Sequence, residues 1–193
     1  MKPQILQSKW HLALILFVAS LTACNNSGKG TAGSNDSTSN KPAHAEAIIS
    51  GTKPDTTVSG TIKFDQDDKE VKMKLELSIP SKANQSVAVH IHDHGECGNM
   101  GKDAMGHWNP TNKQHGKWGS DSFHSGDIGN VDLDAKGNGS MELKTDLWSI
   151  GGDAKTNILD KSIIIHSGVD DYKTQPTGNA GERIGCGVIR KVQ

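Results

Sequence analysis

The sequence has little net charge, no long hydrophobic run and no helical period. Its 193 residues carry 21 basic and 22 acidic side chains, a balance too even to indicate a nucleic-acid partner or an acidic partner. The apolar run Leu12–Val18 is too short to span a bilayer as a permanent helix. Cysteine is also scarce, with three in the chain. These shortages argue against a nucleic-acid-binding protein, a helical fold and a permanent transmembrane helix.

The first 23 residues have the pattern of a removable leader. Two lysines precede Leu12–Val18, and small residues follow it. Leu21–Cys24 (LTAC) resembles the lipobox of bacterial lipoproteins, in which the peptide is cut before the cysteine and the cysteine carries the lipids. We therefore expect a signal peptide over residues 1–23 and a lipid on Cys24 that anchors the chain without spanning the membrane. Ordinary secretion with an unrelated cysteine is the alternative.

The expected anchor predicts a location in the cell envelope, on the outer membrane or its periplasmic face. Asn25, rather than aspartate, follows Cys24 and favours an outer membrane. Removal of residues 1–23 takes away two lysines and leaves 19 basic against 22 acidic residues, a net charge of −3. The lipidated cysteine and a flexible tether are expected over residues 24–45, which are rich in Ser, Gly, Asn and Thr. His44 lies in this stretch and is interpreted as solvated.

Residues 46–193 have the pattern of one small β domain. Apolar residues alternate with charged ones over Val71–Ile79, which predicts a strand with one wet face. In the strand that follows, Val87, Val89 and Ile91 should point into the core. Further strands are expected over residues 131–133, 141–143, 163–166 and 184–192, with a long loop over 169–182. Short strands with regular turn signals predict an all-β antiparallel sandwich or flattened barrel.

Six of the nine histidines lie between His90 and Asp127. Histidine is the commonest protein ligand for transition metals. His90 and His92 should share the strand face that points away from the core. The other candidates lie in a segment rich in Gly, Asn, Asp and Ser, and they are His107, His115, His124 and Asp127. The pattern predicts a metal site outside the sheet and under a long loop. A polar, histidine-rich surface loop is the alternative.

Two cysteines remain once Cys24 is assigned to the lipid. An even pair in an exported chain makes a disulfide between Cys97 and Cys186 the default interpretation. This bond would close a loop of about 90 residues and would pin the histidine-rich loop to the last strand. Metal ligation by these cysteines is the alternative, which is disfavoured because the histidines already supply two sites.

Five segments in order resemble copper/zinc superoxide dismutase. They are His90-Ile-His92 with Gly95-Glu-Cys97, Gly106-His-Trp-Asn-Pro110 with His115-Gly116, His124-Ser-Gly-Asp-Ile-Gly-Asn130, Ile164-Ile-His166 with Asp170-Asp171, and Gly178-Asn-Ala-Gly-Glu-Arg-Ile-Gly-Cys-Gly-Val-Ile189. The resemblance runs from Ala47 to the end of the chain. It implies a Greek-key sandwich or flattened barrel with long metal-binding and electrostatic loops.

The resemblance also implies the role of each site residue. Copper would be held by His90, His92, His107 and His166, and zinc by His107, His115, His124 and Asp127. His107 would then bridge the two metals. Asp170 resembles the aspartate that accepts N–H groups from His90 and His115, and Arg183 resembles the arginine that attracts and binds superoxide beside copper. The implied reaction is dismutation of superoxide to dioxygen and hydrogen peroxide by a redox-cycling copper, with His107 carrying a proton.

The chain departs from the family pattern in places. His94 has no metal role in that pattern and is expected to be an exposed loop residue. Residues 171–177 (DYKTQPT) do not match the charged loop of the animal enzymes, and Lys173 is the one basic residue there. Dimer contacts differ between branches of the family, so a homodimer is an option that the sequence does not decide.

Two other functions fit the same fold. A copper or zinc store would not need Arg183 or a histidine shared by two metals. A structural sandwich with an inactive site would lack a copper ligand, and none is missing.

Overall fold

The computed structural model describes residues 42–193. The expected leader, Cys24 and most of the expected tether lie outside these residues. Within residues 42–193, no helix is long and apolar enough to cross a membrane.

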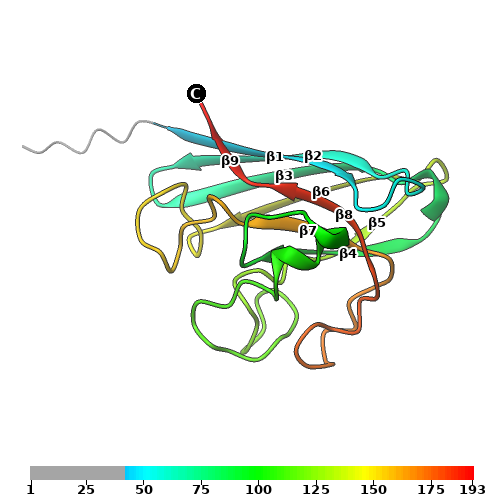
Figure 1. The fold of residues 1–193 in the computed structure, drawn as a ribbon. Coiled ribbons are helices and arrows are strands. Elements are labelled where there is room, and N and C mark those ends of the chain that lie inside the picture. Colours follow the sequence, from blue (N-terminus) through cyan, green and yellow to red (C-terminus); the bar gives the residue numbers. More distant parts are fainter. Residues whose placement is uncertain (1–41) are drawn as a thin grey trace, which may run out of the picture. The chain divides into compact units, whose positions relative to one another are not determined.

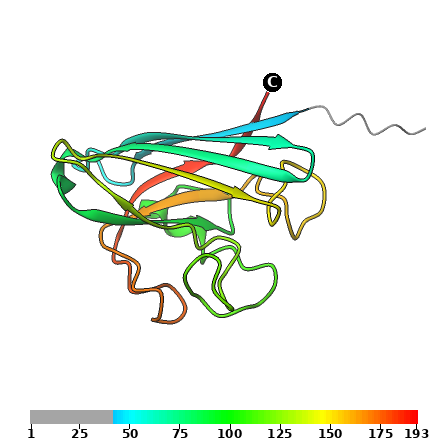
Figure 2. The same ribbon diagram turned by 180° about the vertical axis from the view of Figure 1, so that it is seen from behind.

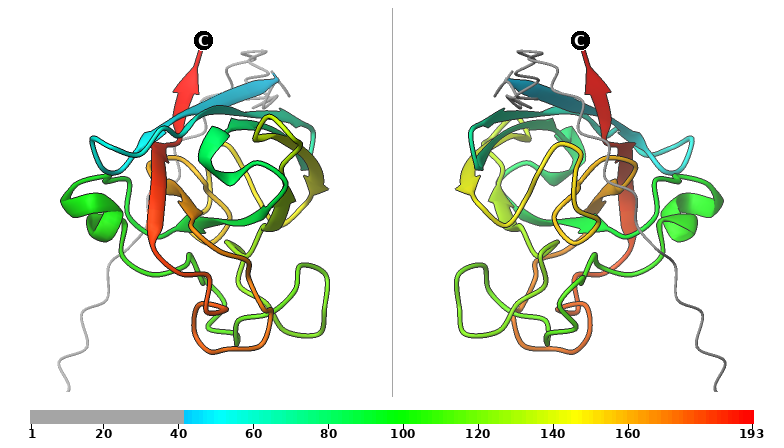
Figure 3. Two further views of the ribbon diagram at one scale, coloured as in Figure 1. Left: turned by 90° about the vertical axis from the view of Figure 1, so that its right-hand side faces the viewer. Right: turned by 90° about the vertical axis from the view of Figure 1, so that its left-hand side faces the viewer.

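The described residues form nine strands and two short 3-10 helices (Figure 1). These are β1 (Ala43–Gly51), β2 (Ser59–Asp67), β3 (Glu70–Ser78), η1 (Pro80–Lys82), β4 (Ser86–His92), η2 (Asn99–Ala104), β5 (Gly129–Asp132), β6 (Asn138–Thr145), β7 (Ser162–His166), β8 (Arg183–Val188) and β9 (Arg190–Val192). The strand order is β5-β4-β7-β8-β1-β2-β3-β6, with β9 added to β1, and every ladder is antiparallel. Seen end-on, the strands form a nearly closed ring (Figure 3). The predicted all-β flattened barrel is confirmed.

Alternating side chains build the core of the barrel. In β3 the apolar residues are buried between exposed lysines and glutamates, as the sequence predicts. In β4, Val87, Val89 and Ile91 join the core, which leaves the alternate histidines on the other face. β1 and β2 were not predicted as separate strands, because the small alanines that β1 buries give a weak two-residue period.

The first and last strands of the domain differ from those expected. β1 begins at Ala43, before the expected start of the domain at residue 46, and His44 on it is within 2.6 Å of the Asp65 carboxylate. The expected closing strand is two strands that break at Ile189. Ile189 is fully buried, and its backbone bonds to Asp160 and Lys161 rather than to β1. A local run of apolar residues cannot show such a change of partner.

Two long loops lie on the same side of the barrel (Figures 1 and 2). We call residues 93–128 the metal loop and residues 167–182 the second loop. They follow β4 and β7, which are neighbours in the sheet. The metal loop is bonded to β4 at Ile91, whose N–H donates to the Gly126 carbonyl (2.8 Å) and whose carbonyl accepts from the Trp108 N–H (2.9 Å). Glycine is required at position 126, because a Cβ there would collide with the Ile91 carbonyl.

The predicted disulfide is confirmed. Cys97 of the metal loop is bonded to Cys186 of β8, with the two Cα atoms 5.7 Å apart and a sequence separation of 89. Metal ligation by these cysteines, the alternative, is therefore wrong. The bond joins the metal loop to the strand that begins with Arg183.

Replacement of both cysteines by serine should lower the free energy of unfolding of the metal-free protein by about 4 kcal/mol, since a closed loop of this length restricts the unfolded chain. Urea denaturation of the metal-free protein measures this. Reduced wild-type protein is the control and should match the double variant. A loss below about 1 kcal/mol would contradict the loop-closure argument.

Candidate metal centre

Four histidines meet where β4 and β7 end beside the metal loop. His90 and His92 are alternate residues of β4 and are fully buried. His166 is the last residue of the neighbouring strand β7, and His107 of the metal loop forms an isolated β-bridge with His92. One ring nitrogen from each of the four lies within 4.8 Å of the others. The structure therefore brings together the four residues of the predicted copper set.

A second buried set shares His107 and comes from the metal loop alone. It consists of His107, His115, His124 and Asp127, whose ligand atoms also lie within 4.8 Å of one another. The Asp127 carboxylate is 2.8 Å from Nδ1 of His107, 3.0 Å from Nδ1 of His115 and 3.2 Å from Nδ1 of His124. Three imidazoles and one carboxylate make a closed set that suits zinc. His107 belongs to both sets through its two ring nitrogens, as predicted.

Six buried ring nitrogens have no hydrogen-bond partner within the described residues. They are Nδ1 of His90, His115 and His124, and Nε2 of His92, His107 and His166. Buried polar atoms normally have partners, and one left without costs about 1–3 kcal/mol. All six belong to the two histidine sets, so the unpartnered atoms are those that a metal would bind. Imidazole suits both copper and zinc, and the residues present fit copper in the first set and zinc in the second.

One carboxylate holds a ring from each set. Asp170 is buried, and its two oxygens accept from Nε2 of His90 (2.8 Å) and Nε2 of His115 (2.9 Å). Asn130 of β5 fixes the Asp170 backbone, accepting from its N–H (2.8 Å) and donating to its carbonyl (3.0 Å). Such contacts set which ring nitrogen carries the proton, so the opposite nitrogen of each ring is free for a metal.

Burial keeps rings of the copper set neutral. It lowers the pKa of His166 to about 3 and, against an opposing contact with Asp127, the pKa of His107 to about 4. Neutral rings offer a lone pair without first losing a proton. The zinc set differs. Burial also acts to lower the pKa of His115, but the carboxylates of Asp127 and Asp170 outweigh it and raise that pKa to about 9.

Arg183 lies directly across the β7–β8 ladder from His166. The register shifts between Ile165 and His166, so the strand is irregular at this pair. Such irregularities re-aim side chains and are common beside active sites. The fold therefore places an arginine from beyond both long loops next to a copper ligand.

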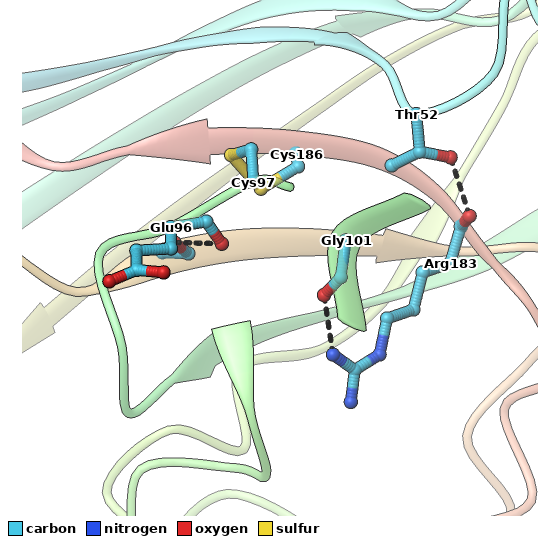
Figure 4. Close-up of a disulfide and its surroundings, with 7 residues drawn as sticks. Thr52, Glu96, Cys97, Gly101, Arg183 and Cys186 are labelled. Atoms are coloured by element: carbon cyan, nitrogen blue, oxygen red, sulfur yellow. Dashed lines mark hydrogen bonds between the residues drawn. A yellow bond between two sulfur atoms is a disulfide. The ribbon is translucent and has the colours of Figure 1, made fainter. Parts of the chain in front are cut away.

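The Arg183 guanidinium is held by backbone carbonyls of the metal loop. It donates to the carbonyl of Gly101 (2.5 Å) and to that of Met105 (2.6 Å). The Met105 carbonyl also accepts from Nδ1 of His92 (2.8 Å), so the arginine and a copper ligand share one acceptor. Figure 4 shows the bond to Gly101 close to the disulfide, together with the Thr52 hydroxyl that donates to the Arg183 carbonyl (2.7 Å). The disulfide therefore secures the segment that orients Arg183.

A cavity of about 300 Å³ lies beside this arginine. It is lined by Lys53, Met100, Lys102, Gly181, Glu182 and Arg183. Lys53 forms an ion pair with Glu182 (2.9 Å), which offsets its charge. Lys102 has no ion-pair partner within residues 42–193. Lys173, the basic residue singled out in the sequence, does not line this cavity.

The sequence patterns did not identify several residues that build the site. The acceptors at Gly101 and Met105 are backbone atoms, for which side-chain patterns give no signal. Trp148 donates from Nε1 to the Ser125 carbonyl (2.8 Å) and so supports the metal loop. Trp148 lies in a part of the sequence without regular apolar alternation. The only signal there was the tryptophan itself, a residue type that is highly buried on average. His94 is exposed, as expected.

Known proteins resemble the chain over most of its length. The family model of copper/zinc superoxide dismutase (SODC) matches residues 58–189. Superoxide dismutase [Cu-Zn] 2 of Aquifex aeolicus is 37% identical over 153 residues, which cover 77% of this chain and 86% of the relative. The extracellular superoxide dismutase [Cu-Zn] of Caenorhabditis elegans is 35% identical over 144 residues, covering 72% and 63%.

A solved structure shares the fold. The crystal structure of the clock protein EA4 matches with a TM-score of 0.68 and 29% identity, covering 77% of this chain and 94% of that one. Fold, family match and two complete metal-ligand sets agree, and the chain belongs to the copper/zinc superoxide dismutase family.

Proposed function

We propose that this superoxide dismutase works outside the cytoplasm, held to a membrane by a lipid on Cys24, and that Arg183 attracts and positions superoxide. The catalytic part of this proposal rests on one observation. Arg183 pairs with the copper ligand His166 across two neighbouring strands. A fixed positive charge beside a redox metal serves a small anionic substrate.

Three observations support a location outside the cytoplasm. The disulfide between Cys97 and Cys186 is of a kind that persists in oxidising compartments. The nematode relative is named as an extracellular enzyme. The leader-like start and LTAC at Leu21–Cys24 support export and lipidation, and Asn25 favours an outer membrane. Antioxidant defence of the cell envelope follows as the proposed role.

Copper, when bound, would supply the one-electron redox couple that two superoxide anions need in order to become dioxygen and hydrogen peroxide. Arg183 would bind the anion. A guanidinium has five N–H donors, and two acceptors are recorded for it among the described residues. The remaining donors are available for substrate. Lys102 on the same cavity would add to the attraction.

The reaction consumes two protons, and His107 would deliver one of them. Its Nδ1 lies in the zinc set beside Asp127 (2.8 Å), and its Nε2 lies in the copper set. The ring therefore stays anchored through Nδ1 while Nε2 takes up a proton and gives it to the product. Water would supply the second proton.

A metal store on the same barrel is the alternative function. A metal store has no use for an arginine that pairs with a copper ligand across two strands, nor for the cavity beside that arginine. Activity that depends on Arg183 therefore separates the two functions.

Replacing His124 with alanine should remove zinc and leave copper. His124 belongs to the zinc set alone, and three donors remain there. Metal analysis of the purified protein should give one copper and one zinc per chain for wild type, because each of the two sets could hold one metal ion, and should give copper alone for the variant. His94→Ala, which alters an exposed histidine of the same loop, is the matched control and should keep both metals. Unchanged zinc in His124→Ala would contradict the zinc assignment.

Activity should fall in the order wild type, Arg183→Lys, Arg183→Glu, by about tenfold and about 100-fold. Lysine keeps the charge but loses the planar fork, and glutamate reverses the charge. Rates are compared at equal copper loading, which should not change because Arg183 is not a ligand. Raising ionic strength shortens the screening length from about 30 Å to about 8 Å and should slow the wild type more than Arg183→Glu. Equal rates for all three proteins would favour the metal store.

Replacing Cys24 with alanine should move the protein from the membrane fraction to the soluble fraction, because the proposed lipid attaches there. Fractionation of cells followed by immunoblotting measures this, and activity per copper should be unchanged. A variant that remains in the membrane fraction would show that something else anchors the chain.

A further inference from the structure

The side chain of Gln175 in the second loop forms two hydrogen bonds with the backbone of the zinc ligand His115. The Gln175 side-chain oxygen accepts from the His115 N–H (2.8 Å), and its amide nitrogen donates to the His115 carbonyl (2.9 Å). The two residues are 60 positions apart and come from different loops. Two hydrogen bonds from one amide fix the peptide groups on both sides of His115.

The second loop is built so that Gln175 stays in place. The Asp171 carboxylate accepts from the backbone N–H groups of Lys173 (2.9 Å) and Thr174 (2.8 Å), and from the Thr174 hydroxyl. The Gly178 N–H donates to the Thr174 carbonyl (2.7 Å), and the Asp171 N–H donates to the Gly178 carbonyl (2.9 Å). These bonds close the segment on itself around Gln175, so the amide is presented by a structured turn.

The same loop touches His115 at two further points. Asp170 accepts from its ring at Nε2 (2.9 Å). Gly178, in the left-handed region at φ +66°, packs so closely that a Cβ would collide with both the Asp170 carboxylate and the His115 ring. The second loop therefore holds this one zinc ligand by its ring and by its backbone.

We propose that Gln175 is a positioning residue for zinc that acts through His115, and that its two hydrogen bonds are a main coupling between the second loop and the zinc site in this chain. Coupling of this kind is reciprocal. If the loop strengthens zinc binding, then zinc holds the loop in place. The proposal concerns zinc affinity and loop order, so it stands or falls independently of the role given to Arg183 and of the membrane anchor.

The test compares two variants of the metal-loaded, full-length protein with a matched control. Gln175→Ala removes the whole amide. Gln175→Met keeps the length of the side chain but loses both hydrogen bonds. The control is Gln114→Ala, because Gln114 is the exposed neighbour of His115 and its side chain makes no hydrogen bond within the described residues. Zinc affinity is measured by competition with a chelator, and copper affinity is measured in the same samples.

Both Gln175 variants should bind zinc about tenfold more weakly or worse, as is typical when a group that orients a ligand is lost. Copper affinity should change much less, and Gln114→Ala should match wild type for both metals. If Gln175→Met bound zinc as tightly as wild type, side-chain packing and not the hydrogen bonds would support zinc binding, and the proposal would be overturned. Equal weakening of zinc and copper would indicate a loosened fold and would overturn it too.

Amide hydrogen exchange provides a second readout that does not depend on activity. In the wild type, zinc should slow exchange across residues 170–178. In Gln175→Ala, that protection by zinc should be largely lost. Protection by zinc that is unchanged in Gln175→Ala would refute the coupling through Gln175.

Discussion

Six imidazole nitrogens are buried without a hydrogen-bond partner in the described residues, and the rest of the site is arranged around them. Two of them, Nδ1 of His115 and Nδ1 of His124, face the Asp127 carboxylate. The other four have no such neighbour, and at about 1–3 kcal/mol each their combined cost is comparable with the whole stability of a typical domain, roughly 5–15 kcal/mol. Only ligands that bind these atoms tightly can offset such a cost. Copper and zinc are therefore part of what stabilises this fold as well as part of its chemistry.

The barrel and the loops contribute differently to holding these atoms. β4 and β7 are adjacent and supply three copper ligands from regular backbone. The zinc ligands come from the metal loop, which has little regular structure of its own. That loop is secured at separate points: the backbone bonds to Ile91, the disulfide, the Trp148 indole and the Asp170 carboxylate. A rigid sheet fixes one metal set, and several cross-links make the other comparably well defined.

Much of this could be predicted from the sequence, and the failures have physical causes. Strong alternation of apolar and polar residues predicted β3 and β4, and sequence motifs predicted both ligand sets. These features depend directly on which side chains are present. The break at Ile189 was missed because its cause is a backbone partner near Asp160, far away in sequence. The shared Met105 carbonyl was missed for the same reason. Gln175 looked like an ordinary polar residue in a loop that did not match its relatives, and only the folded chain shows what it contacts.

The first strand has a consequence for how the enzyme meets its surroundings. β1 lies on the side of the barrel opposite the metal loop and the second loop, as Figures 1 to 3 agree. A chain attached through Cys24, as proposed, would thus enter the domain on the far side from its reacting groups. β1 carries none of the residues of either metal set, so a segment that precedes this strand can change in length without displacing a metal ligand.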